Sequence, residues 1–271
     1  MFSIEAAVIR LIGIDVDGTL VGSDGSVHPR VWEAAARARA DGIRLVLCSG
    51  RPAFGLALEY AGHLDPEGWH VFQNGASVLK INDGQSRSTT LPNHWVGLFI
   101  ARARDTGRVL ELYGDGDYVV ESTAPWALEH AELLGLPFQP RTFESFQAPI
   151  VRAQWLLSPR EAAIVAGEPH EGLEIAQSTS PVMPRTRFVG LTRAGINKGS
   201  ALRALATALQ IDLKDAMYVG DSGNDLAALR MVGHPVAMGN ADSTVRDAAH
   251  QVVGDVDDGG LAEALDAARR L

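Results

Sequence analysis

The stretch LIGIDVDGTLVGSDG, residues 11–25, decides the fold. It continues an apolar run, residues 6–14, that is rich in branched side chains and that only Arg10 interrupts. A short run of this kind, followed directly by an acidic loop with glycine, is typical of a buried parallel strand. Ligands of open α/β sheets bind beyond the carboxyl ends of such strands. We therefore expect residues 15–17, Asp-Val-Asp, to lie at a functional edge of a sheet.

The segments on either side alternate between strand and helix patterns. Pro29 and the pair Asp41-Gly42 bound one predicted helix, because proline favours a first helical turn and glycine favours a helix end. The predicted strands are 43–48, 70–72, 216–220, 235–238 and 251–253, and the predicted helices are 29–40, 52–63, 223–232, 243–249, one from 197 and one from about 260. This alternation predicts an α/β fold with a doubly wound, Rossmann-like parallel sheet.

The middle of the chain has a different pattern. Residues 114–117, Gly-Asp-Gly-Asp, separate two apolar runs and predict a hairpin. The predicted strands here are 108–113, 118–121, 150–157, 173–178 and 186–192, and the predicted helices are 91–105, 125–134 and 159–166. Polar residues 82–90 and residues 192–197 have the composition of linkers. We therefore predict a discontinuous core domain, 1–84 and 192–271, with an inserted α+β cap domain at 85–191.

Composition and charge exclude several classes of protein. The 271 residues are 46% hydrophobic and 21% charged, which is ordinary for a globular chain and excludes a disordered or fibrous one. The net charge of −9 argues against a nucleic-acid partner. No apolar run reaches the roughly 18–20 residues of a membrane span, and the acidic start lacks the basic region of a signal peptide. Cys48 is the only cysteine, so we expect a cytoplasmic protein without disulfides; the oligomeric state stays open.

Two carboxylates follow the first strand. Asp15 and Asp17 lie two residues apart, so in an extended backbone both side chains project to the same side. Such close like charges repel and raise a pKa unless a cation lies between them. Mg²⁺ prefers oxygen ligands of this kind. Taken alone, a solvated turn with Gly18 at its corner explains the motif equally well.

Two further segments begin predicted helices at the same edge. Ser49-Gly50-Arg51 follows the second strand, and a hydroxyl with backbone N–H groups at a helix start can bind phosphate. A simple N-cap is the more common explanation of such a serine. Lys198 falls in a first helical turn, where the helix dipole disfavours a cation unless an anion lies close. Alone, an exposed lysine is its simpler interpretation.

The fourth segment is Gly220–Asp225, GDSGND, at a predicted strand end. Asp221 would add a third carboxylate to a metal site, whereas Ser222 and Asp225 could be helix caps. All four segments lie at strand ends or at helix starts that face that edge. Together they favour one site for phosphate and metal.

In order, these segments resemble the four motifs of the haloacid dehalogenase-like superfamily. The resemblances are GIDVDGTL at 13–20 to motif I, CSGR at 48–51 to motif II, Lys198 to motif III and GDSGND at 220–225 to motif IV. Three more segments resemble its Cof-type branch with a C2-type cap: NGA at 74–76, NKGSAL at 197–202 and VAMGNA at 236–241.

The resemblance implies a magnesium-dependent phosphatase of small phosphorylated metabolites, a sugar phosphate or similar. It makes Asp15 the nucleophile, through an aspartyl-phosphate, and Asp17 the general acid and base. Mg²⁺ would be held by the Asp15 carboxylate, the Asp17 backbone carbonyl and Asp221. The phosphoryl oxygens would be held by the Val16 amide, Ser49, the Gly50 amide, Lys198 and Asn224. Asp225 would orient Lys198 or a metal-bound water.

Two other functions remain open on this fold. A phosphomutase could pass the phosphoryl group of the same phosphoaspartate to a second hydroxyl. A non-catalytic regulatory or binding module is less favoured, because both catalytic carboxylates are present. We expect the inserted domain to close over the site and to select the substrate, with Trp155 and Arg187 as the first residues to test.

Overall fold

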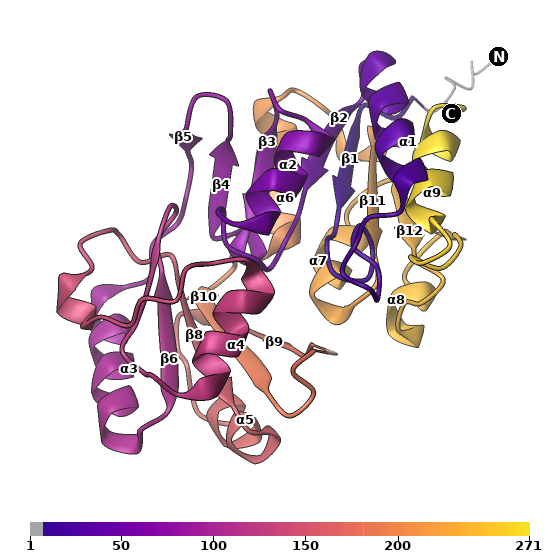
Figure 1. Ribbon diagram of the computed structural model, residues 1–271. Helices are drawn as coiled ribbons and strands as arrows, with labels where there is room; N and C mark the ends of the chain where they lie inside the picture. Colours follow the sequence, from indigo (N-terminus) through magenta and orange to yellow (C-terminus); the bar gives the residue numbers. More distant parts are fainter. Residues whose placement is uncertain (1–7, 181) are drawn as a thin grey trace.

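A parallel sheet of five strands forms the centre of one half of the molecule (Figure 1). The computed structural model describes residues 8–180 and 182–271. The strand order is β13-β12-β11-β1-β2, and all neighbours are parallel. The bounds are β1 Leu11–Ile14, β2 Arg44–Leu47, β11 Ala216–Gly220, β12 His234–Ala237 and β13 Gln251–Val252. Residues 6 and 7 of the expected first strand lie outside the described residues.

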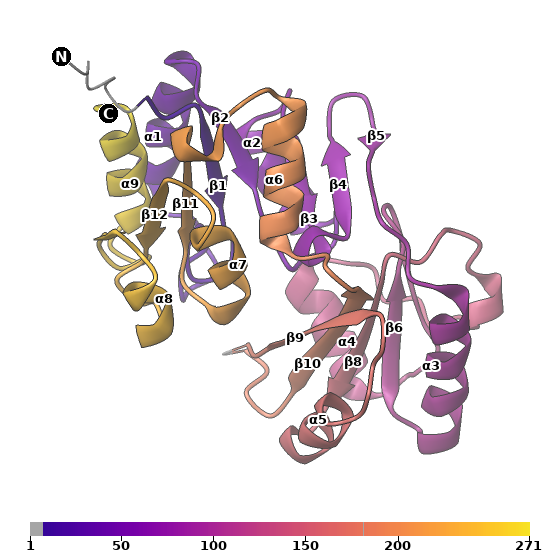
Figure 2. The ribbon, with the colours of Figure 1, turned by 180° about the vertical axis from the view of Figure 1, so that it is seen from behind.

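Helices cover both faces of this sheet, which confirms the doubly wound α/β prediction. Helices α1 (Pro29–Ala40), α2 (Leu56–Leu64) and α9 (Gly260–Ala268) lie on one face. On the other face lie α6 (Lys198–Ala208) and α7 (Leu226–Leu229), as Figure 2 shows. The short helix α8 spans Ser243–Asp247. The 3-10 turns η3 and η4 span Leu213–Asp215 and Gly223–Asp225.

The strand predicted near residues 70–72 lies beside β2 in parallel orientation, but only a single bridge joins the two among the described residues. Strand β3 (Trp69–Phe72) touches the end of β2 through one bridge, Cys48 to Val71. It pairs antiparallel with β4 (Ser77–Lys80), which pairs with β5 (Gln85–Ser86) inside the predicted linker. The 3-10 turn η1 (Gln73–Gly75) reverses the chain with a positive φ of 55° at Asn74. A turn this tight permits only antiparallel pairing.

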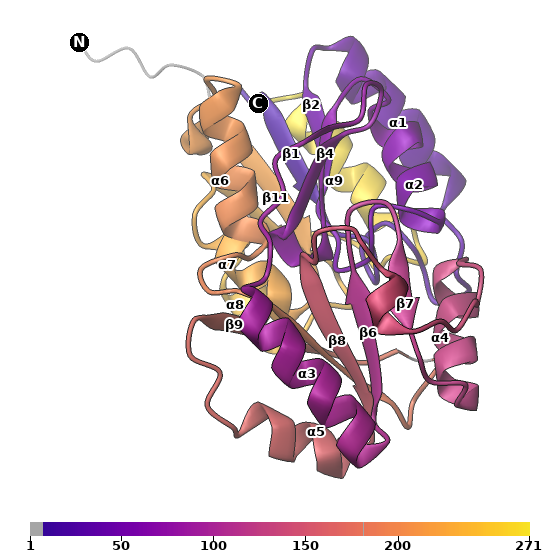
Figure 3. The same cartoon turned by 90° about the vertical axis from the view of Figure 1, so that its left-hand side faces the viewer.

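A second five-stranded sheet is antiparallel throughout, in the order β7-β6-β8-β10-β9. Its strands are β6 Val109–Tyr113, β7 Tyr118–Val120, β8 Arg152–Leu157, β9 Leu173–Ser178 and β10 Arg187–Arg193. Helices α3 (Asn93–Thr106) and α5 (Pro159–Ala166) cover one face, and α4 (Pro125–Leu134) lies on the other (Figure 3). A 3-10 turn, η2, spans Phe143–Ser145. We call this sheet with α3, α4 and α5 the antiparallel module.

The two halves have separate apolar cores. One cluster of buried residues fills the space around the parallel sheet, and two smaller clusters fill the two faces of the antiparallel module. No helix in the described part of the chain is long and apolar enough to cross a bilayer.

Candidate active site

Lys198 lies at the centre of a buried ionic cluster at the carboxyl ends of β1 and β11. Its Nζ contacts Asp15 Oδ1 and donates to Asp225 Oδ1 at 2.8 Å, and its side chain is fully buried. Burial alone would lower the pKa of Lys198, but the charges of Asp15 and Asp225 outweigh it and raise that pKa. Lys198 is therefore an ammonium group held between two carboxylates. Asn197 caps its helix by accepting from the Ser200 backbone N–H at 2.9 Å.

Asp225 has hydrogen bonds on both oxygens. Oδ1 accepts from the Tyr218 hydroxyl at 2.7 Å as well as from Lys198, and Oδ2 accepts from the backbone N–H groups of Asp221 and Ser222, both at 3.1 Å. This carboxylate has little capacity left for a metal, so it positions Lys198 and the loop. Tyr218 was not singled out from the sequence, because it lies inside an apolar strand, and the polar group that it meets comes from seven residues further on.

Three carboxylates surround this single ammonium. Oxygen atoms of Asp15, Asp221 and Asp225 lie within 4.8 Å of one another. Asp221 Oδ1 is buried and has no hydrogen-bond partner among the described residues. Burial, and then the charge of Asp225, raise the pKa of Asp221 to about 7 and raise the pKa of Asp15 as well. The cluster has an excess of buried negative charge and a free oxygen, which fits a divalent cation that prefers oxygen ligands.

Gly18 shows how closely the first loop approaches this cluster. Its φ is +85°, and a Cβ at this position would overlap the carboxylate of Asp221. Only glycine combines this backbone conformation with that contact. The tight approach keeps the Asp17 and Gly18 backbone beside Asp221.

Asp15 and Asp17 do not share a partner, and the extended backbone that the expectation required does not persist through Asp17. The chain bends at Val16, whose carbonyl accepts from the Leu20 and Val21 backbone N–H groups, at 2.9 and 2.8 Å. Asp15 is buried against Lys198, whereas the Asp17 side chain is 62% exposed and pairs with Arg51. The two Arg51–Asp17 contacts measure 2.5 and 3.1 Å. The Val16 side chain is buried.

The loop after β2 is held from two sides. The buried Ser49 Oγ accepts from the Arg51 backbone N–H at 2.9 Å, as an N-cap would, although α2 begins only at Leu56. The Gly50 carbonyl accepts from Arg152 Nη1 on β8 of the antiparallel module. The module therefore touches the same loop that carries the expected phosphate-binding groups.

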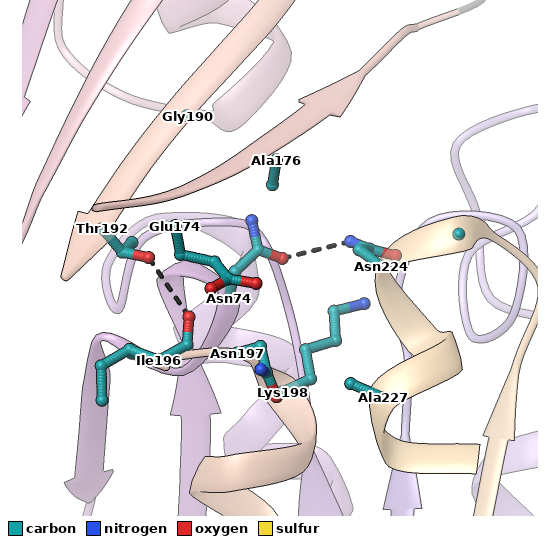
Figure 4. A pocket seen from close by; sticks show the side chains of 11 residues that line it. Asn74, Glu174, Ala176, Gly190, Thr192, Ile196, Asn197, Lys198, Asn224 and Ala227 are labelled. Atoms are coloured by element: carbon teal, nitrogen blue, oxygen red, sulfur yellow. Dashed lines mark hydrogen bonds between the residues drawn. The ribbon is translucent and has the colours of Figure 1, made fainter. Parts of the chain in front are cut away.

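A cavity lies beside Lys198, between the parallel-sheet half and the antiparallel module (Figure 4). Asn224 lines it, and its Nδ2 donates to Asn74 Oδ1 at 3.1 Å. Asn74 was noted only as part of a family resemblance. Its signal was the Asn-Gly pair, which is typical of a turn with positive φ. From the module, β9 and β10 contribute Glu174, Ala176, Gly190 and Thr192.

The two module residues chosen from the sequence do not face this cavity. Trp155 is 1% exposed and packs edge-on against Phe99 of α3, on the opposite face of the sheet. The Arg187 guanidinium donates to the carbonyls of Pro184 and Thr186. In a strand, only alternate residues face one side, so the neighbours Arg152 and Gln154 of β8 lie on the other face.

Comparison with known proteins agrees with this geometry. A family model described as haloacid dehalogenase-like hydrolase matches residues 12–265. A Streptococcus pyogenes protein, provisionally named a phosphatase, is 27% identical over 95% of this chain and 97% of its own length. The HMP-PP phosphatase of Escherichia coli is 24% identical over 88% of this chain and 86% of its own.

A solved structure has the same fold over almost the whole chain. It is a haloacid dehalogenase-like hydrolase from Bacteroides thetaiotaomicron, 26% identical, with a TM-score of 0.82 over 96% of this chain and 99% of that one. The family match covers far more than half of the sequence. The chain therefore belongs to the haloacid dehalogenase-like hydrolases and is an enzyme of that family, as its four motifs predicted.

Proposed function

We propose that this enzyme is a magnesium-dependent phosphatase of small phosphate monoesters and that it works through an aspartyl-phosphate. One observation carries the proposal: the buried ammonium of Lys198 lies between Asp15 and Asp225, next to an Asp221 oxygen that has no partner in the described part of the chain. The carboxylates of this site outnumber its cations, which leaves room for a metal ion. The Lys198 ammonium is a fixed cation that an anionic group of a substrate can contact. The phosphatase names of relatives over most of the chain support the same chemistry.

In the first step, an Asp15 oxygen attacks phosphorus in line, and the ester oxygen leaves with a proton from Asp17. In the second step, water attacks the phosphorus of the aspartyl-phosphate while Asp17 takes its proton. Inorganic phosphate leaves, and the Asp15 carboxylate is restored. Asp17 must first leave Arg51, whose side chain is largely buried, whereas the Asp17 side chain is exposed and free to turn toward the ester oxygen.

The phosphoryl oxygens would be held by groups from all four motifs: the Val16 and Gly50 amides, the Ser49 hydroxyl, Lys198 and Asn224. Ser49 Oγ already accepts from the Arg51 N–H, so its own hydrogen is available to a ligand. Asp225 keeps the Lys198 ammonium in place. Positioning and electrostatic stabilisation of this kind are most of what phosphoryl transfer requires.

Asp15, Asp221 and the Asp17 backbone carbonyl would hold Mg²⁺. The ion would offset the repulsion between the Asp15 carboxylate and the phosphate dianion. Asp225 has both oxygens in hydrogen bonds and is left out of this ligand set.

We further propose that residues 1–84 and 192–271 form the core domain and that residues 85–191 form a cap over it. The contact of Arg152 with Gly50 and the stacking of Phe54 on Tyr113, at 6.4 Å between ring centroids, support a cap that covers the site. A covered site suits a small phosphorylated metabolite. The net charge of −9 and the single cysteine favour a cytoplasmic enzyme that acts without nucleic acid or membrane.

The test is phosphate release from p-nitrophenyl phosphate by the purified protein, with Mg²⁺ and with excess chelator. We expect activity with Mg²⁺ only. Asp15→Asn should lower turnover by about 10⁴-fold or more, because it removes the nucleophile at constant shape. Its circular dichroism spectrum should be unchanged. The control Asp258→Asn removes an exposed carboxylate and should leave turnover unchanged.

Three results would contradict the proposal. They are full activity in chelator, near-normal turnover of Asp15→Asn, and transfer of the phosphoryl group to a second hydroxyl without release of phosphate. The last result would identify a phosphomutase.

A further inference from the structure

The antiparallel module leaves one part of its inner face open. Helix α4 packs against part of that face through residues such as Ala127 and Ala131. At β9 and β10 the same face carries Ala176 and Gly190. These two residues are too small to fill the space, and the cavity of Figure 4 lies there. It continues to Lys198, whose ammonium contacts the proposed nucleophile, Asp15.

The cavity has one negative charge without a partner. Glu174 of β9 lines it, and Glu174 Oε2 accepts only a weak hydrogen bond, from the Gly195 N–H at 3.3 Å. No lysine, arginine or histidine of the described residues forms an ion pair with Glu174. Lys198 is the one cationic residue among the described residues of the lining, and its ammonium already contacts Asp15 and Asp225. The leaving-group side of the cavity is therefore negative.

Asn74 offers the complementary hydrogen-bonding group. Its Oδ1 accepts from Asn224, so its NH₂ is the end that remains for a ligand. Figure 4 shows this nitrogen directed toward Ala176, into the cavity. A carboxylate accepts and an amide NH₂ donates. A neutral hydroxyl group, which both donates and accepts, satisfies the two together, whereas an ammonium group satisfies only the carboxylate.

We infer that Glu174 is a specificity-determining residue, which selects phosphate esters with a hydroxyl-bearing leaving group and rejects those with a second anionic group. The inference rests on the proposed phosphatase activity, because that activity places the leaving group in this cavity. Like charges in a partly buried site repel strongly, and an unpaired charge is an effective means of rejecting a competing ligand. We expect the discrimination to be about tenfold or more in kcat/KM.

The test compares three esters of similar size: glycerol 3-phosphate with hydroxyls, phosphoethanolamine with an ammonium and 3-phosphoglycerate with a carboxylate. The wild type should prefer glycerol 3-phosphate to both others. Glu174→Gln should lower the ratio of kcat/KM for glycerol 3-phosphate to that for 3-phosphoglycerate by about tenfold. The control Glu129→Gln removes an exposed carboxylate of α4 outside the cavity and should leave the ratio unchanged.

A second variant changes the ratio in the opposite direction. Ala176→Asp adds a carboxylate to the same cavity and should strengthen the rejection of 3-phosphoglycerate. A substitution that acted only through folding would lower kcat/KM for all three esters together and leave the ratios alone. The two variants thus separate a charge effect from a structural one.

The possible failures are distinguishable. If the wild type releases phosphate from none of the three esters and none from p-nitrophenyl phosphate, the proposed function is wrong. If it is active but Glu174→Gln and Ala176→Asp leave the ratio within about twofold of the wild type, the inference about Glu174 is wrong. A wild-type preference for phosphoethanolamine would also overturn it, because the cavity would then select a cation.

Discussion

Two buried polar clusters lie on opposite sides of the contact between the parallel-sheet half and the antiparallel module. The first contains Lys198 with Asp15, Asp221 and Asp225, which are three carboxylates for one ammonium. The second lies in the module around Glu111, which is fully buried. Both are costly to bury, since charges lose their hydration inside a protein.

In the module cluster, hydrogen bonds occupy both oxygens of the buried carboxylate. Glu111 Oε2 accepts from the Tyr113 hydroxyl at 2.5 Å and from Gln154 at 3.3 Å, and Oε1 lies 2.9 Å from His130 Nδ1. Arg152 supplies the opposite charge, with its guanidinium 4.3 Å from the centre of the Tyr113 ring. Among the described residues, the Arg152 guanidinium forms no ion pair with Glu111, and its buried Nε has no hydrogen-bond partner.

The comparison teaches how to separate a functional cluster from a structural one. In the module, hydrogen bonds occupy both oxygens of the carboxylate, and the unpartnered buried atom is a donor, Nε of Arg152. Beside Lys198, a buried oxygen of Asp221 has no partner in residues 8–180 and 182–271, and negative charge is in excess. An imbalance of this kind costs stability and is kept where a ligand completes it.

The largest expected effect comes from removing the one cation of the first cluster. Lys198→Met should lower the free energy of unfolding in chelator by about 3–5 kcal/mol at pH 8, because Asp15 and Asp225 stay buried without a counter-charge. The loss should be smaller at pH 5, because burial raises the pKa of Asp15 and a protonated Asp15 needs no counter-charge. Urea denaturation measures the free energy of unfolding at both pH values.

The control is Lys214→Met, which removes an exposed lysine and should change the stability by no more than about 0.5 kcal/mol. Equal stability of Lys198→Met and Lys214→Met would mean that the ammonium does not balance the buried carboxylates.

A smaller effect on stability is expected from the buried His70. Unlike His130, it has no carboxylate side chain as its partner among the described residues. His70 of β3 accepts from the Leu47 N–H on Nδ1 at 3.1 Å, and its Nε2 lies 2.9 Å from the Asp65 carbonyl. The neutral ring satisfies both contacts, and burial lowers the pKa of His70 to about 4. The unfolded chain therefore binds this proton more readily than the folded one.

Stability from His70 is present above its ordinary pKa of about 6.5 and is lost as the pH falls toward 4, by about 3 kcal/mol in full. His70→Gln removes this titration. We therefore plot the free energy of unfolding, measured in urea, against pH between 7 and 4. The curve should fall more steeply for the wild type than for the variant. Parallel curves would show that His70 is not held neutral.

The smallest effect is expected in the module cluster. Glu111→Gln keeps the shape but replaces one acceptor oxygen by NH₂ and leaves Arg152 without its opposite charge. We expect a loss of about 1–3 kcal/mol in stability. Turnover of p-nitrophenyl phosphate should stay within about threefold of the wild type, because Glu111 lines no part of the cavity. A large loss of turnover with unchanged stability would make the module cluster part of the active site.

The sequence by itself determined the elements with local signals. Helices α4 and α5 have the predicted bounds, 125–134 and 159–166, since each has proline in the first turn and glycine after the last residue. Strands β9 and β11 also have the predicted bounds. The helix predicted at 223–232 was too long, because residues 223–225 form a 3-10 turn and α7 ends at Leu229.

The sequence also identified four candidate site residues, because chemical groups at the ends of parallel strands converge. They are Asp15, Ser49, Lys198 and Asp221. Only the tertiary structure decided what each of them meets: Asp17 turns to Arg51, and Tyr218 and Asp225 hold Lys198. It also decided that β3 pairs with β4 and that Trp155 faces away from the cavity while Glu174 lines it. Local patterns report how a backbone bends and which residues alternate. Pairing, and the choice of face that meets a distant segment, depend on contacts between residues far apart in the chain.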